Sequence, residues 1–395
     1  MSKKRPVYIE LIGIGLPNRG AELLARAVMQ SCNKQFGNCI FATAQKLPEP
    51  ELKKLGIKRC LKNGAGRLQS LLSTLKTNRL TKSQRRPSIY RAFSWLPREQ
   101  RDRLDIVLEQ DVDLVIDASG FAYGDYWGSA KAQRRLEDRR AGWQAQNKPL
   151  VFLPQSFGPF DTDGFKTSLK PSLDCAACVC VRDRQSAQYL VPFIKKARLY
   201  PDITFLLDCG TSLPATKPYS LFIPNNKVLE AGAVDHAEYI SVAREFIRLS
   251  RQLNVEPIML NHEGVKDLAI CQQLSDLDQV RVLNPADALL IKAYIAGAEF
   301  VFSSRYHGVV SSLATETPVV VFGWSHKYRE LLQDFGLEHW LIDDIHQASK
   351  VLGEFCAPPA LAEIRGKING HLPWVRQQLN EMWRWIFSSV HLPRL

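Results

Sequence analysis

Arginine and histidine stand two residues apart in SSRYHG, the stretch from Ser303 to Gly308. An apolar run, EFVF, precedes it and VVSSLATET follows, which predicts a strand, a turn and a helix. Arg305 and His307 then lie on the turn beside the N–H groups that begin the helix. Such a helix start favours anions, an arginine fork binds carboxylate or phosphate, and a histidine gives or takes a proton near neutral pH. We expect an anion site here; the alternative is a histidine that only caps a neighbouring carbonyl.

A second cation follows the next predicted strand. Lys327 lies in FGWSHKYRELL, directly after the apolar run PVVVF, and begins a predicted helix. The carboxyl ends of parallel strands lie at the same edge of a sheet, so Lys327 is expected near the turn of Arg305 and His307. Its neighbour His326 should face away, because adjacent helix positions do not share a face.

Polar residues also follow apolar runs in the first half of the chain. Arg182 follows ACVCV and precedes Asp183, so it is either a binding cation or the salt-bridge partner of that aspartate. Asp117 ends the run LVID and suits a base that takes a proton from a sugar hydroxyl, with a buried structural carboxylate as the alternative.

The loops beside these strand ends carry the other candidates. Tyr123, Tyr126 and Trp127 in GFAYGDYW are rings that can stack on a sugar. Asn18 lies in GIGLPNRGAE, where it stands in place of the third glycine of a dinucleotide-binding fingerprint. The glycines of that turn either let the backbone approach an anion or only make a tight turn.

Buried strands and amphipathic helices alternate through both halves of the chain. Apolar runs occur at 7–14, 113–119, 149–156 and 177–183, and TSLPATKPYS (211–220) is typical of a linker before a second alternation. This pattern predicts parallel sheets covered on both faces. We expect an α/β protein of two Rossmann-like, doubly wound domains facing a cleft, over 1–212 and 218–370, and a C-terminal helix, 371–395, packing back on the first domain.

Positive charge is concentrated in one segment. The formal net charge is +12, and residues 53–103 hold fifteen Lys and Arg against two acidic residues. Aromatic residues are few there and no nucleic-acid-binding motif is present, so we expect no nucleic-acid partner. Two interpretations stay open: a solvated surface, and a peripheral contact with an anionic membrane.

Several other classes of protein and site are disfavoured. No run approaches the roughly 20 apolar residues that span a bilayer, and Glu10 interrupts the apolar start, which we interpret as a first strand and not a signal peptide. Nine cysteines without framework spacing favour the cytoplasm. Cys175, Cys178 and Cys180 have no partner pair at zinc-like spacing. We therefore expect neither a metal nor a cofactor.

Taken in order, these motifs resemble those of a known family. SSRYHGVVSSLATETPVVVFGWSHKYRELLQDFGLE is similar to the C-terminal signature of the polysaccharide pyruvyl transferases, and PNRGAELL, VIDASGFAYGD, LPQSFGPF, VRDRQSAQYL, PDITFLL and IMLNHEGVKD precede it in the family's order. The resemblance implies a GT-B-like fold. It also implies transfer of the pyruvyl unit of phosphoenolpyruvate onto two hydroxyls of a sugar, in a polysaccharide or lipid-linked glycan, to form a cyclic ketal with release of phosphate.

The resemblance also assigns roles. Arg305 and His307 match the family's Arg and His at the phosphoenolpyruvate site, Lys327 its following lysine, and Arg182 the arginine of its V-R-D motif. His307 is then expected to donate a proton or to stabilise the leaving phosphate, and Asp117 to activate the hydroxyl. The remaining candidates are Ser304 and Gly308 on the donor side and Asn18, Tyr123, Tyr126 and Trp127 on the acceptor side.

The chain also departs from the family's pattern. Ala118-Ser119-Gly120 replaces a glycine-rich run, Ala21 replaces the acidic residue after the first-loop glycine, and segment 53–103 has no counterpart. These differences bear on the acceptor more than on the donor. Two rival functions stay open, because a fold does not fix a function: a GT-B-type glycosyltransferase that uses a nucleotide sugar, and a non-catalytic glycan-binding relative.

Overall fold

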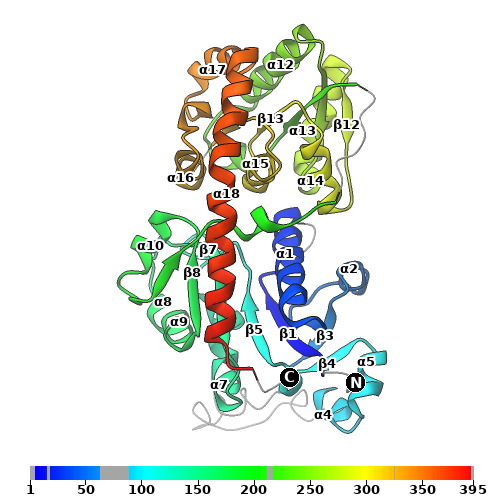
Figure 1. The fold of residues 1–395 in the computed structure, drawn as a ribbon, viewed down its shortest axis with the longest axis vertical. Helices are drawn as coiled ribbons and strands as arrows, with labels where there is room; N and C mark the ends of the chain where they lie inside the picture. Colours follow the sequence, from blue (N-terminus) through cyan, green and yellow to red (C-terminus); the bar gives the residue numbers. More distant parts are fainter. Residues whose placement is uncertain (1–4, 16–17, 63–88, 211–216, 324, 393–395) are drawn as a thin grey trace, which may run out of the picture. The chain divides into compact units, whose positions relative to one another are not determined.

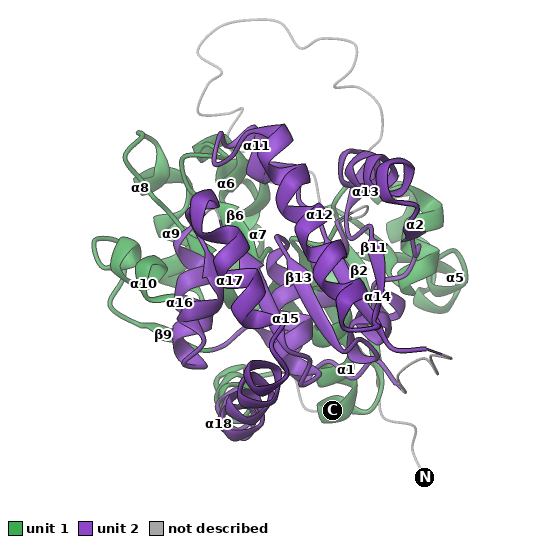
Figure 2. Ribbon diagram, turned by 90° about the horizontal axis from the view of Figure 1, so that it is seen from above, with its two compact units in different colours: residues 1–16, 24–200, 381–395 green, residues 17–23, 201–380 purple. Residues whose placement is uncertain are grey.

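The computed structural model describes residues 5–15, 18–62, 89–210, 217–323 and 325–392. The chain groups into two compact units (Figure 2). Unit 1 holds Met1–Leu16, Leu24–Tyr200 and Glu381–Leu395, and unit 2 holds Pro17–Leu23 and Pro201–Asn380. The predicted linker at 211–220 lies mostly outside the described residues, and the grouping changes between Tyr200 and Pro201, ahead of the predicted boundary at 212.

Unit 1 is built on a parallel sheet of order β4-β3-β2-β1-β5-β7-β8-β9. The predicted apolar runs form its fully buried centre: β1 (Val7–Ile12), β5 (Leu114–Asp117), β7 (Leu150–Phe157) and β8 (Cys178–Val181). The strands that sequence reasoning missed are short: β2 (Cys39–Thr43), β3 (Lys58–Leu61), β4 (Ile106–Leu108), β6 (Phe121–Tyr123) and β9 (Ala197–Leu199). The order reverses between β1 and β5, so their carboxyl ends mark the place where such sheets bind ligands.

A charged residue lies inside this sheet. Glu10 in β1 is 1% exposed. Arg139, on α7 (Asp138–Ala145), donates from Nη2 to Glu10 Oε2 at 2.7 Å and to Glu109 Oε1 at 2.6 Å. Both partners are buried with it, so the ion triad compensates charges that burial would otherwise penalise. This explains how a strand with a central glutamate stays fully buried.

Unit 2 has a second parallel sheet, of order β12-β11-β10-β13-β14-β15. Its strands are β10 (Tyr219–Ile223), β11 (Glu256–Leu260), β12 (Arg281–Leu283), β13 (Phe300–Ser303), β14 (Val319–Phe322) and β15 (Leu341–Ile342). The order reverses between β10 and β13. This is the arrangement of a Rossmann-type sheet, and it confirms the predicted fold class.

Helices of unit 2 follow its strands as predicted (Figure 1): α12 (His236–Gln252), α13 (Gly264–Asp278), α14 (Ala288–Ala296) and α15 (Tyr306–Ala314). Unit 2 also contains the short α11 (Lys227–Glu230), α16 (His326–Asp334) and α17 (Ala348–Phe355). Gly308 lets α15 begin close against the sheet. A Cβ at that position would lie 2.5 Å from Ser303 Oγ and 3.3 Å from Ile223 Cδ1.

The C-terminal helix is longer than predicted. α18 spans Pro358–Ser389, so it begins well before the predicted start at 371, and it continues through Pro373. From Glu381 onward the helix groups with unit 1, where Phe387 meets Phe36 of α1 (Arg19–Phe36) edge to face at 5.1 Å. The expected packing of the chain's end on the first domain is thereby confirmed.

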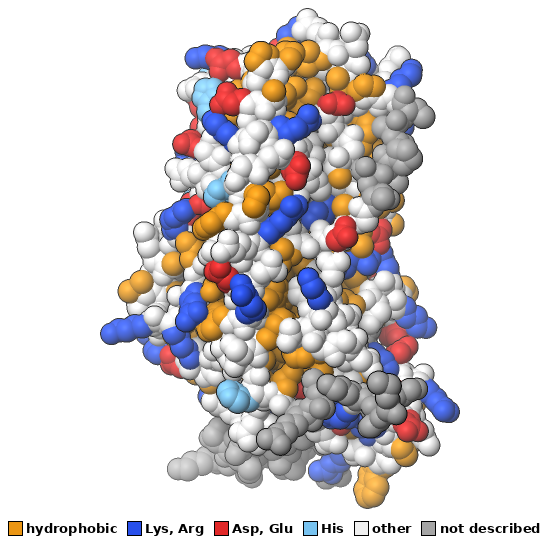
Figure 3. Space-filling view, in the orientation of Figure 1, with side chains coloured by type: hydrophobic (Ala, Val, Ile, Leu, Met, Phe, Trp, Pro, Cys, Tyr) orange, Lys and Arg blue, Asp and Glu red, His pale blue; other side chains and the backbone are white. Residues whose placement is uncertain are grey.

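The basic segment 53–103 is described in part, since residues 63–88 lie outside the described residues. Several of its described cations bind within unit 1: Lys58 Nζ lies 3.2 Å from Asp102 Oδ1, Arg101 Nη2 lies 2.6 Å from Asp111, and the Arg98 guanidinium stacks on Tyr8. On the face shown in Figure 3, the described Lys and Arg side chains are spread among acidic and apolar ones.

No described helix combines the length and the apolar character that crossing a bilayer requires.

Candidate functional site

The carboxyl ends of β10 and β13 are held together by hydrogen bonds around Ser304. The Ser304 carbonyl accepts from Asn225 Nδ2 at 2.9 Å and from the Tyr328 hydroxyl at 2.8 Å. Its own hydroxyl lies 2.7 Å from the Tyr239 hydroxyl. Ser304 is fully buried. The residue expected to bind the donor therefore fixes the backbone from which Arg305 and His307 project.

Arg305 binds two carboxylates, that of Asp267 on α13 and that of Glu263 directly before this helix. Its Nε donates to Asp267 Oδ2 at 2.7 Å and its Nη1 to Glu263 Oε2 at 2.5 Å. Asp267 is fully buried, and this burial raises its pKa to about 6, against the opposing effect of Arg305. The predicted anion-binding fork thus has its charge balanced in the structure, which favours a supporting role for it.

His307 lies on the first turn of α15, beside two other elements of unit 2. Its Nε2 is 3.5 Å from Asp202 Oδ2. On another side, a Cβ added to Gly20 in the first turn of α1 would come within 2.2 Å of Nδ1. The ring therefore lies where the starts of α1 and α15 meet, and the partial positive charge of both helix starts favours an anion there.

Asp202 is itself fixed. Its Oδ1 accepts from the Thr204 backbone N–H at 2.9 Å and from the Thr204 hydroxyl at 2.7 Å, capping the 3-10 turn η4 (Ile203–Leu206). Lys292 on α14 is buried and donates to the carbonyls of Thr204 and Leu207 at 2.8 and 2.7 Å. Burial lowers the pKa of Lys292 to about 8. PDITFLL, quoted only as a family motif, is thus the segment that presents a carboxylate to His307.

A second histidine belongs to this region. His262 follows β11, is 2% exposed, and neither of its ring nitrogens has a hydrogen-bond partner among the described residues. Burial first, and then the charges of Arg305, His307 and Arg19, hold its pKa well below the ordinary value. His262 is therefore a neutral imidazole. In the sequence, His262 lies in IMLNHEGVKD, which was quoted only as a family motif. We refer to His307, His262, Arg305, Asp202 and Gly20 as the His307 site.

Lys327 approaches the same turn from α16. Its Nζ lies 5.5 Å from the centroid of the Tyr306 ring and 5.5 Å from that of Tyr328. The Tyr306 ring in turn meets the His307 ring at 5.5 Å. The ammonium group therefore lies near the start of α15.

The first-domain candidate Asp117 ends β5 and is 0% exposed. Its Oδ1 accepts from the Ser119 N–H at 2.9 Å and its Oδ2 from the Tyr123 hydroxyl at 2.5 Å. Tyr123 is likewise 0% exposed. Both carboxylate oxygens are thus engaged. These contacts favour the alternative for Asp117, a buried structural carboxylate. The buried Tyr123 ring has no face on which a sugar could stack.

The two other aromatic candidates are exposed. Tyr126 is 66% and Trp127 is 41% exposed, and their rings meet edge to face at 4.7 Å. Lys131 lies over the Trp127 ring, 3.5 Å from its centroid. A ring pair fixed in this way on the surface of unit 1 suits stacking on a sugar.

Arg182 and Asn18 take part in local hydrogen bonds. Arg182 Nε donates to Ser156 Oγ at 3.0 Å, and that hydroxyl donates to Asp183 at 2.6 Å. Asp183 also caps α10 (Arg184–Leu190), so arginine and aspartate are joined through a serine. Asn18 Oδ1 accepts from the Ala21 N–H at 3.0 Å and caps α1.

The cysteine cluster has no features of a metal centre. Cys178 and Cys180 lie in β8 and are buried, and Cys175 ends α9 (Lys170–Cys175). Burial raises the pKa of all three thiols, which disfavours the thiolate that binds metal.

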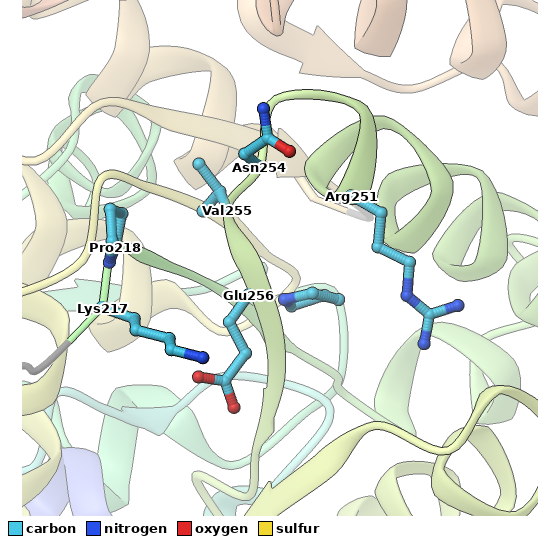
Figure 4. Close-up of a pocket in the computed structure, with 7 residues that line it drawn as sticks. Lys217, Pro218, Arg251, Asn254, Val255 and Glu256 are labelled. Atoms are coloured by element: carbon cyan, nitrogen blue, oxygen red, sulfur yellow. The ribbon is translucent and has the colours of Figure 1, made fainter.

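Unit 2 also has a surface depression (Figure 4). It is lined by Lys217, Pro218, Arg251, Asn254, Val255, Glu256 and Pro257. These residues include the amino ends of β10 and β11, whereas the His307 site lies at the carboxyl ends. Ligands of doubly wound sheets bind at the carboxyl ends, so we do not assign the function to this depression.

Solved structures with the same fold come from several sugar-nucleotide proteins. The pneumococcal O-GlcNAc transferase GtfA in complex with UDP and GlcNAc matches with a TM-score of 0.55 at 10% identity, covering 98% of this chain and 100% of that one. MnaA of S. aureus with UDP matches at 0.54 and 10%, covering 98% and 99%. The UDP-GlcNAc 2-epimerase from Neisseria meningitidis matches at 0.50 and 9%, covering 96% and 99%. The fold is therefore of the GT-B type.

No curated protein matches the sequence. The family model of the polysaccharide pyruvyl transferases matches residues 18–326, a range that includes α1, Asp202, His262 and the whole SSRYHG turn. The chain belongs to the polysaccharide pyruvyl transferase family.

Proposed function

We propose that this protein transfers the pyruvyl group of phosphoenolpyruvate to two hydroxyls of a sugar in a polysaccharide or lipid-linked glycan. The observation that carries the proposal is His307, whose ring lies at the start of α15 and against the first turn of α1. A family match over residues 18–326 supports the reaction class.

The negative charges of the donor suit the positive groups around the His307 site. Phosphoenolpyruvate carries a phosphate and a carboxylate, and both need positive partners when they leave water. Lys327 and the starts of α1 and α15 supply positive charge, and the neutral imidazole of His262 can donate one N–H without adding a charge. Arg305 contributes by holding the turn through Asp267 and Glu263.

The chemistry assigned to His307 is proton transfer. Protonated His307 gives its proton to the methylene carbon of the donor, and the first sugar hydroxyl attacks the central carbon. His307 then takes the proton of that hydroxyl. The second hydroxyl displaces phosphate at the same carbon, and its proton leaves with the phosphate. The products are a cyclic ketal and inorganic phosphate.

The acceptor side is assigned to unit 1. Tyr126 and Trp127 are the exposed rings of the predicted set, and we propose that they stack on the acceptor sugar. Asp117 is not needed as a base, because His307 receives the hydroxyl proton.

Binding and turnover test the proposal directly. Calorimetric titration should show binding of phosphoenolpyruvate and no binding of UDP-sugars at the same concentrations. With a panel of glycan acceptors, phosphate release should appear for one of them and fall at least 100-fold in His307→Gln, as expected for loss of a general acid–base. A protein that binds only UDP-sugars would be a glycosyltransferase. Glycan binding without phosphate release from any acceptor would indicate a non-catalytic relative.

A further inference from the structure

Nε2 of His307 has an anionic neighbour, Asp202, to which sequence reasoning assigned no role. Asp202 Oδ2 lies 3.5 Å from it. The Asp202 side chain is 0% exposed and that of His307 is 14% exposed, so water has little access to the gap between them. Nε2 is buried and has no hydrogen bond to any described residue. A contraction of a few tenths of an ångström would make one, and hydrogen bonds of this type are often long before substrate binds.

The other nitrogen has a different neighbourhood. Nδ1 lies against Gly20, so it faces the first turn of α1. The two nitrogens are thus directed to different partners, Nε2 to a fixed carboxylate and Nδ1 to a helix start that favours anions.

The carboxylate cannot readily turn away. Its Oδ1 holds two hydrogen bonds from Thr204, and η4 is fixed in turn by the buried ammonium of Lys292. The other oxygen, Oδ2, lies 3.5 Å from Nε2 of His307. A buried carboxylate, fixed at one oxygen, therefore presents its second oxygen to one ring nitrogen.

We propose that Asp202 is the positioning residue of His307: it accepts the Nε2–H, holds the ring against α1, and so leaves Nδ1 as the nitrogen that exchanges protons with the substrate. The catalytic part rests on the proposed function, whereas the tautomer does not depend on it. In the proton balance given above, Nδ1 loses its proton to the donor carbon and regains one from the sugar hydroxyl. Nε2 keeps its proton throughout, because Asp202 accepts it.

Asp202→Asn tests this with nearly unchanged shape. The amide oxygen should stay on Thr204, because both groups there are donors. The NH₂ group then faces Nε2 and can only donate a hydrogen bond. Nε2 must therefore be unprotonated to accept it, and the ring proton moves to Nδ1. The same reversal of a carboxylate–histidine pair gives the wrong histidine tautomer in serine proteases.

The measurement is ¹⁵N NMR of protein labelled at its eight histidines, at a pH where the rings are neutral. The His307 signals are identified by their loss in His307→Gln. We expect the Nε2–H tautomer in the wild type and the Nδ1–H tautomer in Asp202→Asn. Asp344→Asn is the matched control, because Asp344 also caps a 3-10 turn, η6 (Ile345–Gln347), through the His346 N–H. It should leave the His307 signals unchanged. An unchanged tautomer in folded Asp202→Asn would overturn the proposal.

Turnover gives a second and separate result. With phosphoenolpyruvate and an active acceptor, Asp202→Asn should lower kcat at least 100-fold while the calorimetric affinity for phosphoenolpyruvate changes less than about threefold. Equal turnover in the variant would refute a positioning role in catalysis. If the wild type releases no phosphate with any acceptor but the tautomer still reverses, the proposed function fails and the assignment of Asp202 stands.

Discussion

Gly20 of α1 lies against the ring of His307, and a Cβ at residue 20 would come within 2.2 Å of Nδ1. Gly20→Ala should therefore push the imidazole out of place. We expect turnover to fall at least 10-fold, because small displacements of a reacting group are costly. The free energy of unfolding should fall little, since alanine favours the helix by up to about 1 kcal/mol. Phosphate release and urea unfolding measure the two effects.

Gly366→Ala is the matched control for this change. Gly366 lies inside α18, and nothing is within 4 Å of a Cβ added there. It should change neither turnover nor the ¹⁵N signals of His307. If Gly20→Ala is as active as this control, the ring is not held in the position described.

Arg305 is predicted to matter for stability before it matters for binding. Arg305→Gln leaves the buried Asp267 without its partner, and breaking such a pair costs about 3–5 kcal/mol. Adding Asp267→Asn should recover part of that loss, because the unpaired charge is then gone. Urea unfolding of the single and double variants gives the coupling. Variants that unfold like the wild type but bind phosphoenolpyruvate at least tenfold more weakly would make Arg305 a donor-binding residue instead.

Lys292 gives a pH dependence with a definite sign. Burial lowers its pKa to about 8, below the 10.5 of an unperturbed lysine. Between these pH values the unfolded chain binds a proton that the folded chain does not, so stability rises with pH through this window. Relative to Lys292→Met, the wild type should gain roughly 2–3 kcal/mol in unfolding free energy between pH 8 and pH 10.5. A constant difference across this range would show that Lys292 is charged and compensated throughout.

Arg139 should be needed for unit 1 to fold. Arg139→Met leaves the buried Glu10 without its arginine and takes one partner from the buried Glu109, so we expect a loss of about 3–5 kcal/mol in urea unfolding. A triple variant with Glu10→Gln and Glu109→Gln should recover much of this. Arg140→Met is the control, since Arg140 binds Glu137 at the half-buried surface, where such pairs contribute about 1 kcal/mol or less. Equal effects of the two arginines would exclude the buried triad as a source of stability.

The sequence predicted the elements of unit 2 well, because its buried strands are continuous apolar runs separated by clear helical patterns. The short strands β2, β3 and β4 escaped, since three to five residues carry too little periodicity. The SSRYHG turn was found from residue types at a strand end. Asp202 was not, because its role depends on η4 folding back to α15, a contact that local pattern cannot show. The ion pairs of Arg305 also escaped, because Asp267 lies on a separate helix, α13, and Glu263 directly before it.

The basic segment predicts salt-dependent contact with anionic membranes. Residues 53–103 carry fifteen cations against two acidic residues, and the described part exposes Trp95 to 87% and also exposes Arg91, four residues earlier in the chain. A ring of this kind inserts at the membrane interface while neighbouring cations meet lipid phosphates. The full chain should cosediment with vesicles containing phosphatidylglycerol at about 50 mM salt and dissociate at about 500 mM, because salt screens exposed charges.

Trp95→Ala should weaken binding and Trp374→Ala, at an exposed ring of α18, should not. Equal binding to vesicles of neutral phosphatidylcholine would rule out an electrostatic contact, and no binding at low salt would leave the segment as a solvated surface.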